Sequence, residues 1–378
     1  MSKQKITALE YIRGISMLGV VGIHTGSYSL SNPTVNVHLF ALLEILTRFS
    51  VPIFFFVSAF GLFINQDLTT KLNYTQFLLR RARTVLLPYI VWSIFYMLHY
   101  TFISNDFSIW KPPLLYEYAL FGLASCQLYF LVILLWFYAL MPLWRLIVQR
   151  IIDHPIRYLS VILVLQIIFN YYSSYLLKVD IPNHYISKAL SFRLNYWVLH
   201  YLFIFLLGAV CAIRYADFEQ CLHRYTKHIK NFFYITVVGM LSFYYYLLYV
   251  AHYKPEQAVN TAHQLSPIGV LYTLSTTLFL FFLFNKPNLP AVSKKFLALF
   301  GKYSYLVYLI HPLIMYYLDS YLSGHNIILS ARIVIFFYLF TTGSSLLFAI
   351  FVNKISTFFP FINLLLTGSK LPKQKSGV

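Results

Sequence analysis

Charged residues are scarce in this chain: they make up 11% of its 378 residues, and only 11 residues are Asp or Glu. So few polar side chains do not cover the surfaces of the two or three soluble domains that this length otherwise predicts. Intrinsic disorder is also excluded, because 59% of the residues are hydrophobic and a disordered chain needs low hydrophobicity. The composition therefore predicts a membrane protein with a lipid-facing exterior.

Cysteine is scarce as well. The three cysteines, Cys126, Cys211 and Cys221, are dispersed and odd in number, which excludes a secreted disulfide scaffold. Their spacing forms neither a redox motif nor a zinc motif. We therefore expect no metal site.

Apolar stretches recur along the chain, each of about 20 residues, the length that spans a bilayer as a helix. They lie at 11–30, 39–64, 84–104, 126–147, 157–177, 194–213, 231–250, 267–285, 298–318 and 330–353. We predict an all-α polytopic membrane protein of about ten transmembrane helices. A single membrane domain occupies residues 1–367, and residues 368–378 form a basic cytoplasmic tail.

The net charge of +18 is explained by topology, so no nucleic-acid partner is expected. If the N-terminus is cytoplasmic, 22 of the 29 Lys and Arg residues fall in cytoplasmic segments. Such an excess of positive charge on one side orients membrane proteins. We therefore predict that both termini are cytoplasmic and that the exterior of the helices contacts a lipid bilayer.

The first apolar stretch contains three ionisable residues, Glu10, Arg13 and His24. The eleven residues from Arg13 to His24 make about three helical turns, so both side chains project from one stripe, which Glu10 joins. A charge at the centre of a lipid-facing helix costs about 2.5 to 3.5 kcal/mol on insertion scales. We therefore expect this stripe to face the interior of the bundle or a wet cavity.

His24 has two interpretations. An imidazole is the usual general base because its unperturbed pKa is about 6.5. The alternative is a packed histidine that bonds a neighbouring helix.

A second polar group stands at the start of the third predicted helix, where Arg80, Arg81 and Arg83 occur together. Guanidinium groups bind phosphate through two parallel hydrogen bonds, and this position is open to a phosphate-bearing cosubstrate from the cytosol. The alternative is that these arginines only contribute to the positive-inside bias.

Other polar residues in predicted spans have simpler explanations. Glu44 and Arg48 are four residues apart and are expected to form an intrahelical pair that neutralises both charges. His311 precedes Pro312, which leaves a backbone carbonyl without its helical donor. Arg193 and Arg332 either line an outer acceptor site or extend from loop edges into the interface.

In order along the chain, these motifs resemble the acyltransferase-3 family of integral membrane acyltransferases over nearly the whole length. The most specific element is an early Arg, ten intervening residues and then His, which Arg13 and His24 match; the acid before them, usually Asp, is Glu10 here. Further matches are the Arg-x-x-Arg pair Arg80 and Arg83, the segment 51–60 with Ser58, and the segment 304–312 with Tyr305 and His311. Two departures occur: Ala59 replaces a Gly, and 127–131 only partly meets a His-x-Trp-Phe-Leu pattern.

The resemblance implies an O-acyltransferase that moves an acyl group, commonly acetyl from acetyl-CoA, to a hydroxyl of an extracytoplasmic glycan or other envelope acceptor. The compact size is similar to the exopolysaccharide-modifying members, including the intercellular-adhesion type, for which succinyl is an alternative acyl group. The resemblance also implies a bacterial cytoplasmic membrane and a glycan synthase as a possible partner. Ser58, Tyr305 and His311 become acceptor-site or structural candidates.

Together these readings predict a mechanism. Arg80, Arg81 and Arg83 hold the CoA phosphates, and the thioester enters the bundle towards His24. His24 deprotonates the acceptor hydroxyl or transiently accepts the acyl group. Arg13, balanced by Glu10, orients the donor or stabilises negative charge. The competing function is an exporter of a polysaccharide or small polar solute, in which the same residues line a translocation path.

Overall fold

The computed structural model describes residues 6–30, 36–286 and 289–369, and none of these residues forms a strand. The all-α prediction is therefore confirmed for the described part of the chain. The helices are α1 Thr7–Ser29, α2 Val37–Phe40, α3 Ser50–Phe63, α4 Tyr74–Arg81, α5 Leu87–Ser104, α6 Leu114–Phe121, α7 Tyr129–Ala139, α8 Met141–Ile151, α9 Pro155–Tyr171, α10 His184–Ser191, α11 Leu202–Ile213, α12 Tyr215–Arg224, α13 Thr226–Tyr249, α14 Pro255–Thr261, α15 Pro267–Phe284, α16 Ala291–Gly324, α17 Ala331–Ile355 and α18 Pro360–Thr367.

Short turns of other helix types join or interrupt these elements. The π-helical turns are η1 Ala41–Ile45, η2 Ala82–Leu86 and η4 Tyr172–Leu176, and the 3-10 turns are η3 Ser108–Trp110, η5 Arg193–Asn195 and η6 Val198–Tyr201. Two of the π-helical turns, η1 and η4, lie inside predicted spans, and η2, which connects α4 to α5, overlaps the start of a third.

Seven helical segments of the described chain are long and apolar enough to cross a membrane, and two bent helix pairs raise the number to nine. The seven are Val37–Phe63, Tyr74–Ser104, Pro155–Leu176, Thr226–Tyr249, Pro267–Phe284, Ala291–Gly324 and Ala331–Ile355. These segments confirm a polytopic membrane protein. The one predicted stretch not among these nine is the first, 11–30, which forms α1. This helix is less apolar because it carries Glu10, Arg13 and His24.

The predicted span 126–147 is broken rather than straight, because α7 and α8 meet at 70°. A second bend, of 102°, separates the segment Val198–Ile213 from α12, just after the predicted span 194–213 ends. The expectation of one helix over 126–147 is therefore wrong in detail, since α7 begins only at Tyr129 and ends at Ala139. Pro142 stands in the first turn of α8, where its missing N–H removes a hydrogen bond that would continue α7.

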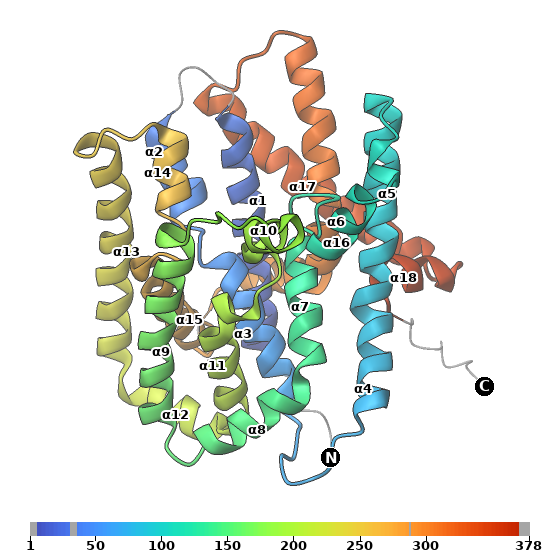
Figure 1. Ribbon diagram of the computed structural model, residues 1–378. Helices are drawn as coiled ribbons and strands as arrows, with labels where there is room; N and C mark the ends of the chain where they lie inside the picture. Colours follow the sequence, from blue (N-terminus) through green and yellow to red (C-terminus); the bar gives the residue numbers. More distant parts are fainter. Residues whose placement is uncertain (1–5, 31–35, 287–288, 370–378) are drawn as a thin grey trace.

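Basic residues gather at one end of the bundle, which we call the basic end. Figure 1 shows α4, α8 and α12 together at the bottom of the view, whereas α2 and α14 lie at the top. The arginines of these three helices are Arg80, Arg81, Arg145, Arg150 and Arg224. The cytoplasmic location of this end stays a prediction. Most of the predicted tail, residues 370–378, lies outside the described residues.

α1 and α16 approach each other unusually closely, at two glycines. A Cβ atom placed on Gly14 would overlap the carbonyl oxygen of Leu297, and one placed on Gly301 would overlap the carbonyl oxygen of Glu10. Backbone contact of this kind requires residues without side chains. The two glycines therefore hold α1, with its three ionisable residues, directly against α16.

We expect Gly301→Ala to destabilise the protein by about 1–3 kcal/mol, because the added methyl group forces α1 away from α16. The measurement is thermal unfolding of the purified protein in detergent. Gly343→Ala in α17 is the matched control, because no described atom lies within 4 Å of a Cβ atom at that position. Equal unfolding temperatures for the two variants would contradict the close packing of α1 on α16.

Candidate functional site

Two histidines from helices far apart in sequence meet inside the bundle. The ring centroids of His24 on α1 and His311 on α16 are 5.2 Å apart, with the planes tilted by 42°. His311 is fully buried, and its Nδ1 lies 3.1 Å from the carbonyl oxygen of Val307. Because only a protonated Nδ1 can donate to that carbonyl, Nε2 carries the free lone pair. Nε2 has no hydrogen-bond partner in the described part of the chain.

The segment that precedes α7 reaches this pair of imidazoles. The Sγ atom of Cys126 lies 3.7 Å from Nδ1 of His24. The neighbouring Gln127 is bound to α16 by two hydrogen bonds. Its side-chain amide donates to the carbonyl of Leu309 at 3.4 Å, and its backbone carbonyl accepts from the hydroxyl of Tyr308. The motif that departs most from the family pattern, 127–131, therefore adjoins the histidine pair.

A buried ion pair lies close to the histidines. The guanidinium of Arg48 and the carboxylate of Glu44 are 2.6 Å apart, and the Glu44 side chain is 2% exposed. The predicted intrahelical pair is thus confirmed. Ser27 donates a further hydrogen bond to Glu44 at 3.3 Å, and Arg48 donates to the carbonyl of Val259 at 3.3 Å.

The charge of Arg48 acts on its surroundings despite this pairing, and His24 is one of its electrostatic neighbours. His263, in the loop before α15, is another. Burial, together with the positive charge of Arg48, lowers the pKa of His263 to about 4. His263 is therefore neutral at physiological pH, and Arg48 supplies the positive charge in this part of the bundle.

A second group of polar side chains surrounds Tyr138, at the end of α7 that adjoins the basic end. We call it the Tyr138 cluster, and it consists of Arg13, Ser58, Arg81, Tyr138 and Tyr305. The hydroxyls of Ser58 and Tyr138 are 3.2 Å apart, and the Arg81 guanidinium lies over the Tyr138 ring at 5.1 Å. Arg13 and Tyr305 are electrostatic neighbours of the same tyrosine. The structure thus brings together four candidates that the sequence placed on separate helices.

The three arginines at the start of the third span differ in their surroundings. Arg80 and Arg83 are exposed, whereas Arg81 is half-buried. The Nε atom of Arg80 donates to the carbonyl of Gln76 at 3.3 Å. Arg81 also lies over the ring of Phe77 at 5.3 Å, so Arg81 faces the interior and the Arg-x-x-Arg pair faces outwards.

The stripe on α1 connects the two groups. α1 is continuous from Thr7 to Ser29, so Arg13 and His24 are separated by about 16 Å along its axis. Arg13 interacts electrostatically with Glu10, one turn earlier. The structure therefore places Arg13 and Glu10 towards Tyr138 and places His24 at the other histidine, rather than joining all three in one centre.

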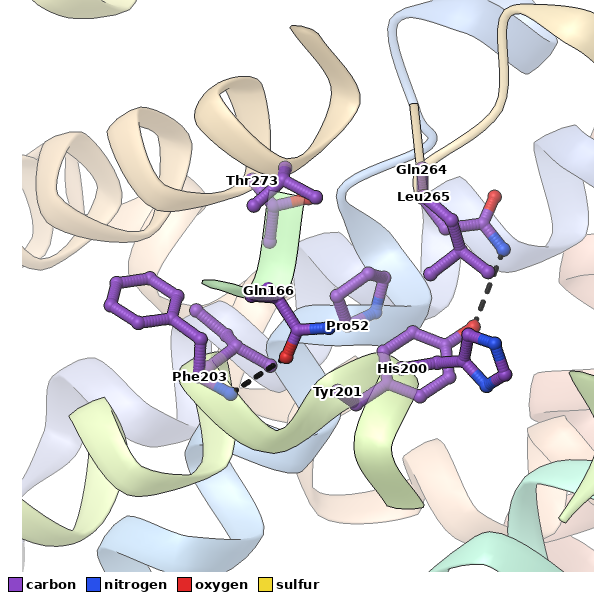
Figure 2. A pocket seen from close by; sticks show the side chains of 10 residues that line it. Pro52, Gln166, His200, Tyr201, Phe203, Gln264, Leu265 and Thr273 are labelled. Carbon is purple, nitrogen blue, oxygen red and sulfur yellow. Dashed lines mark hydrogen bonds between the residues drawn. The ribbon is translucent and has the colours of Figure 1, made fainter. Parts of the chain in front are cut away.

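A small cavity lies elsewhere in the bundle, lined by Gln166, His200, Tyr201 and Gln264 among others (Figure 2). It has room for about one water molecule. Several of its polar groups are paired: Gln166 accepts from the backbone amide of Phe203 at 3.0 Å, and Gln264 donates to Tyr201 at 3.5 Å. His200 pairs with Ser173 at 2.9 Å. This cavity is therefore a structural feature and not a substrate site.

Sequence reasoning missed two residues of these groups, Cys126 and Tyr138. Tyr138 is one aromatic residue in a chain that is 20% aromatic, and Cys126 stands at the first position of a predicted span. Neither has a local signal that separates it from its neighbours. Arg193 is half-buried, and its guanidinium donates to the carbonyls of Ser173 and Leu190. Within the described ranges, no three His, Cys, Asp or Glu residues are grouped as metal ligands.

Comparison with known proteins identifies the family. The model of the acyltransferase domain matches residues 6–353, which is nearly the whole chain. In the searches of curated proteins and of solved structures, nothing matches this chain. The match includes both polar groups described above, from Arg13 to His311. The chain therefore belongs to the acyltransferase-3 family and is a membrane acyltransferase.

Proposed function

We propose that the protein transfers an acyl group, in the first instance acetyl from acetyl-CoA, to a hydroxyl of an extracytoplasmic glycan or other envelope acceptor. The observation that carries this proposal is the pairing of His24 with His311 at 5.2 Å within the bundle of a family member. An imidazole with a lone pair inside a membrane domain is suited to take a proton from a hydroxyl nucleophile.

The donor binds from the basic end. Arg80 and Arg83, exposed at the start of the third span, and the half-buried Arg81 present guanidinium groups to the CoA phosphates. The pantetheine arm then runs along α1 past the Tyr138 cluster. It covers the distance of about 16 Å between Arg13 and His24, and so brings the thioester to the histidine pair.

At the histidine pair, His24 removes the proton of the acceptor hydroxyl as its oxygen attacks the thioester carbonyl. The new C–O bond forms, the C–S bond to CoA breaks, and the proton passes from His24 to the departing thiolate. His311 lies beside His24, and its Nε2 lone pair, which has no partner among the described residues, is available to a hydrogen-bond donor on the incoming substrate. Arg13, balanced by Glu10, orients the donor on its way in.

The cellular setting follows from the same proposal. The basic end faces the cytosol of a bacterial cell, in agreement with the positive-inside rule, and the histidine pair receives the acceptor from the other side. A membrane glycan synthase is the partner that supplies a polysaccharide acceptor. Acyl-CoA is the cosubstrate, and the reaction as written needs no metal.

The decisive experiment supplies acetyl-CoA, labelled in the acetyl group, to inside-out membranes that contain the protein. We expect label in base-labile ester on envelope glycan, and none in membranes without the protein. Succinyl-CoA is the second donor to be used. Absence of transfer from both donors would contradict the proposal, and solute flux in proteoliposomes would then test the exporter function.

We expect Arg81→Ala to raise the KM for acyl-CoA roughly tenfold, because a hydrogen bond to a charged group contributes about 1.5–3 kcal/mol and tenfold corresponds to about 1.4 kcal/mol. The Arg80→Ala, Arg83→Ala double variant should weaken donor binding as well. Arg150→Ala, an exposed arginine on α8, is the control and should keep the KM of the wild type. An unchanged KM in Arg81→Ala would limit this residue to a packing role.

A further inference from the structure

Cys126 is placed as a nucleophile beside the histidine pair. Its Sγ atom is 3.7 Å from Nδ1 of His24 and equally far from the side-chain oxygen of Gln127, and Cys126 is a free cysteine in an exposed position of the chain. Cys211 and Cys221, by contrast, lie in α11 and α12. A cysteine and a histidine within contact distance are the usual components of thiol-based acyl transfer. The mechanism above makes no use of Cys126.

The segment that carries Cys126 is held in a defined turn. Gly122 adopts a left-handed conformation with φ of 69°, and a Cβ atom there would lie 2.7 Å from the backbone of Tyr129. Ser125 donates to the side-chain oxygen of Gln127 at 2.6 Å, and Gln127 is itself anchored on α16. The thiol is therefore positioned by contacts on both sides and does not depend on a free loop.

A second observation indicates that a ligand enters at this point. His311 is fully buried, and its Nε2 has no hydrogen-bond partner among the residues that the structure describes. A buried lone pair without a partner is unfavourable, so this atom is suited to a group that is present only during the reaction. His24 connects the two features, since it contacts both His311 and Cys126.

We propose that Cys126 carries the acyl group between the two substrates as a thioester. This inference rests on the proposed function, and it replaces direct attack of the acceptor on acyl-CoA by two successive steps. In the first step, His24 takes the proton from Sγ while the sulfur attacks the thioester carbonyl of acyl-CoA. The new C–S bond to Cys126 forms, the C–S bond to CoA breaks, and the proton returns from His24 to the CoA thiolate.

The second step regenerates the enzyme. The acceptor hydroxyl gives its proton to His24 as its oxygen attacks the acyl carbonyl. The C–O bond of the ester forms, the C–S bond to Cys126 breaks, and the cysteine thiolate recovers the proton. One thioester replaces another in the first step, so no further reactant is needed. An ordinary cysteine thiol has a pKa of about 8.5, so it is largely protonated at neutral pH. A cysteine nucleophile therefore requires an adjacent base such as His24.

The route has a consequence for substrate order. The acyl group stays on the protein after CoA leaves, so donor and acceptor never need to occupy the histidine pair together. CoA can depart towards the basic end before a bulky glycan reaches Cys126. Acyl exchange between acyl-CoA and free CoA therefore requires no acceptor, and this makes the proposal testable before the acceptor is known.

The experiment uses the purified full chain, acetyl-CoA or succinyl-CoA, whichever supports transfer in membranes, and no acceptor. We expect acyl label on the protein that neutral hydroxylamine removes, and exchange of labelled CoA into acyl-CoA. Cys126→Ala should lose both signals. Cys211→Ala and Cys221→Ala are the matched controls and should keep both.

Cys126→Ser provides a second variant of nearly the same size. We expect the serine to retain acyl label as an oxygen ester, resistant to neutral hydroxylamine and released by base, with slower transfer than the wild type because a hydroxyl is the weaker nucleophile. Size-exclusion profiles in detergent verify that each variant is folded. If Cys126→Ala aggregates, the serine variant decides between the two outcomes.

Three results overturn the proposal. Wild-type transfer by a folded Cys126 variant would mean direct transfer in a ternary complex, and would leave the proposed function intact. Label that persists in Cys126→Ala and disappears in His24→Ala would assign the acyl group to the histidine. Absence of transfer by the wild type from either donor would refute the proposed function, and this inference with it.

Discussion

His24→Ala is expected to reduce acyl transfer by about 10²–10⁴-fold, the range that a positioned general base contributes. The variant removes the imidazole that contacts both His311 and Cys126. Without it, the thiol of Cys126 loses the imidazole that lies 3.7 Å away, and the acceptor hydroxyl loses its proposed base. The loss should appear in the rate of transfer and not in the amount of protein in the membrane, because His24 is half-buried and lies beside an exposed cysteine.

The measurement is label transfer from acyl-CoA in inside-out membranes, with equal amounts of each variant. His325→Ala is the control, because His325 is exposed at the end of α16 and bonds the carbonyl of Tyr321 at 2.8 Å. It should transfer at the wild-type rate. Full activity in a correctly folded His24→Ala protein would remove His24 from the mechanism and leave only the packing interpretation.

Glu44→Ala is expected to lower the free energy of unfolding by about 3–5 kcal/mol, since removal of one partner leaves a buried charge uncompensated. The Glu44 carboxylate is 2.6 Å from Arg48 and almost fully buried. It also packs against α1, because a Cβ atom on Gly26 would overlap its Cγ atom. The truncation therefore leaves Arg48 charged inside the bundle and opens a void beside α1.

Unfolding in detergent measures this effect, and two comparisons isolate its cause. Asp217→Ala breaks the exposed pair with Arg214, whose side chains are 41% and 59% exposed, and should cost only about 0–1 kcal/mol. The double variant Glu44→Ala, Arg48→Ala should be more stable than Glu44→Ala alone, because the unpaired charge is gone. Equal losses for Glu44→Ala and Asp217→Ala would show that burial of the pair has no energetic consequence.

Much of the fold could be predicted from the sequence, because membrane-spanning helices depend on local composition. Each predicted apolar stretch coincides with helical segments of the structure, since a run of about 20 apolar residues has few alternatives in a bilayer. The breaks were harder to predict. Pro142 is visible in the sequence, but whether a proline kinks a span or ends it depends on what surrounds the freed backbone groups. In the structure the chain turns by 70° there and α8 begins.

The residues of the candidate site could be predicted from the sequence only in part. The polar stripe on α1 was identified because Glu10, Arg13 and His24 are costly in lipid and share one helix face. His311, Arg81 and Ser58 were named for their motifs, without any indication of how they would meet. Cys126 and Tyr138 have no such motif and became candidates only through their contacts with His24 and Arg81.

The sequence by itself determined that this chain is a helical membrane protein with ionisable residues on its first helix, because hydropathy and helical spacing are properties of neighbouring residues. Only the tertiary structure decided which residues they meet, with His24 beside His311 and Arg13 near Tyr138. The meeting of His24 with His311 depends on the close packing of α1 on α16, whose backbones touch at Gly14 and Gly301. Such an approach arises from the packing of distant helices, which no local pattern of residues specifies.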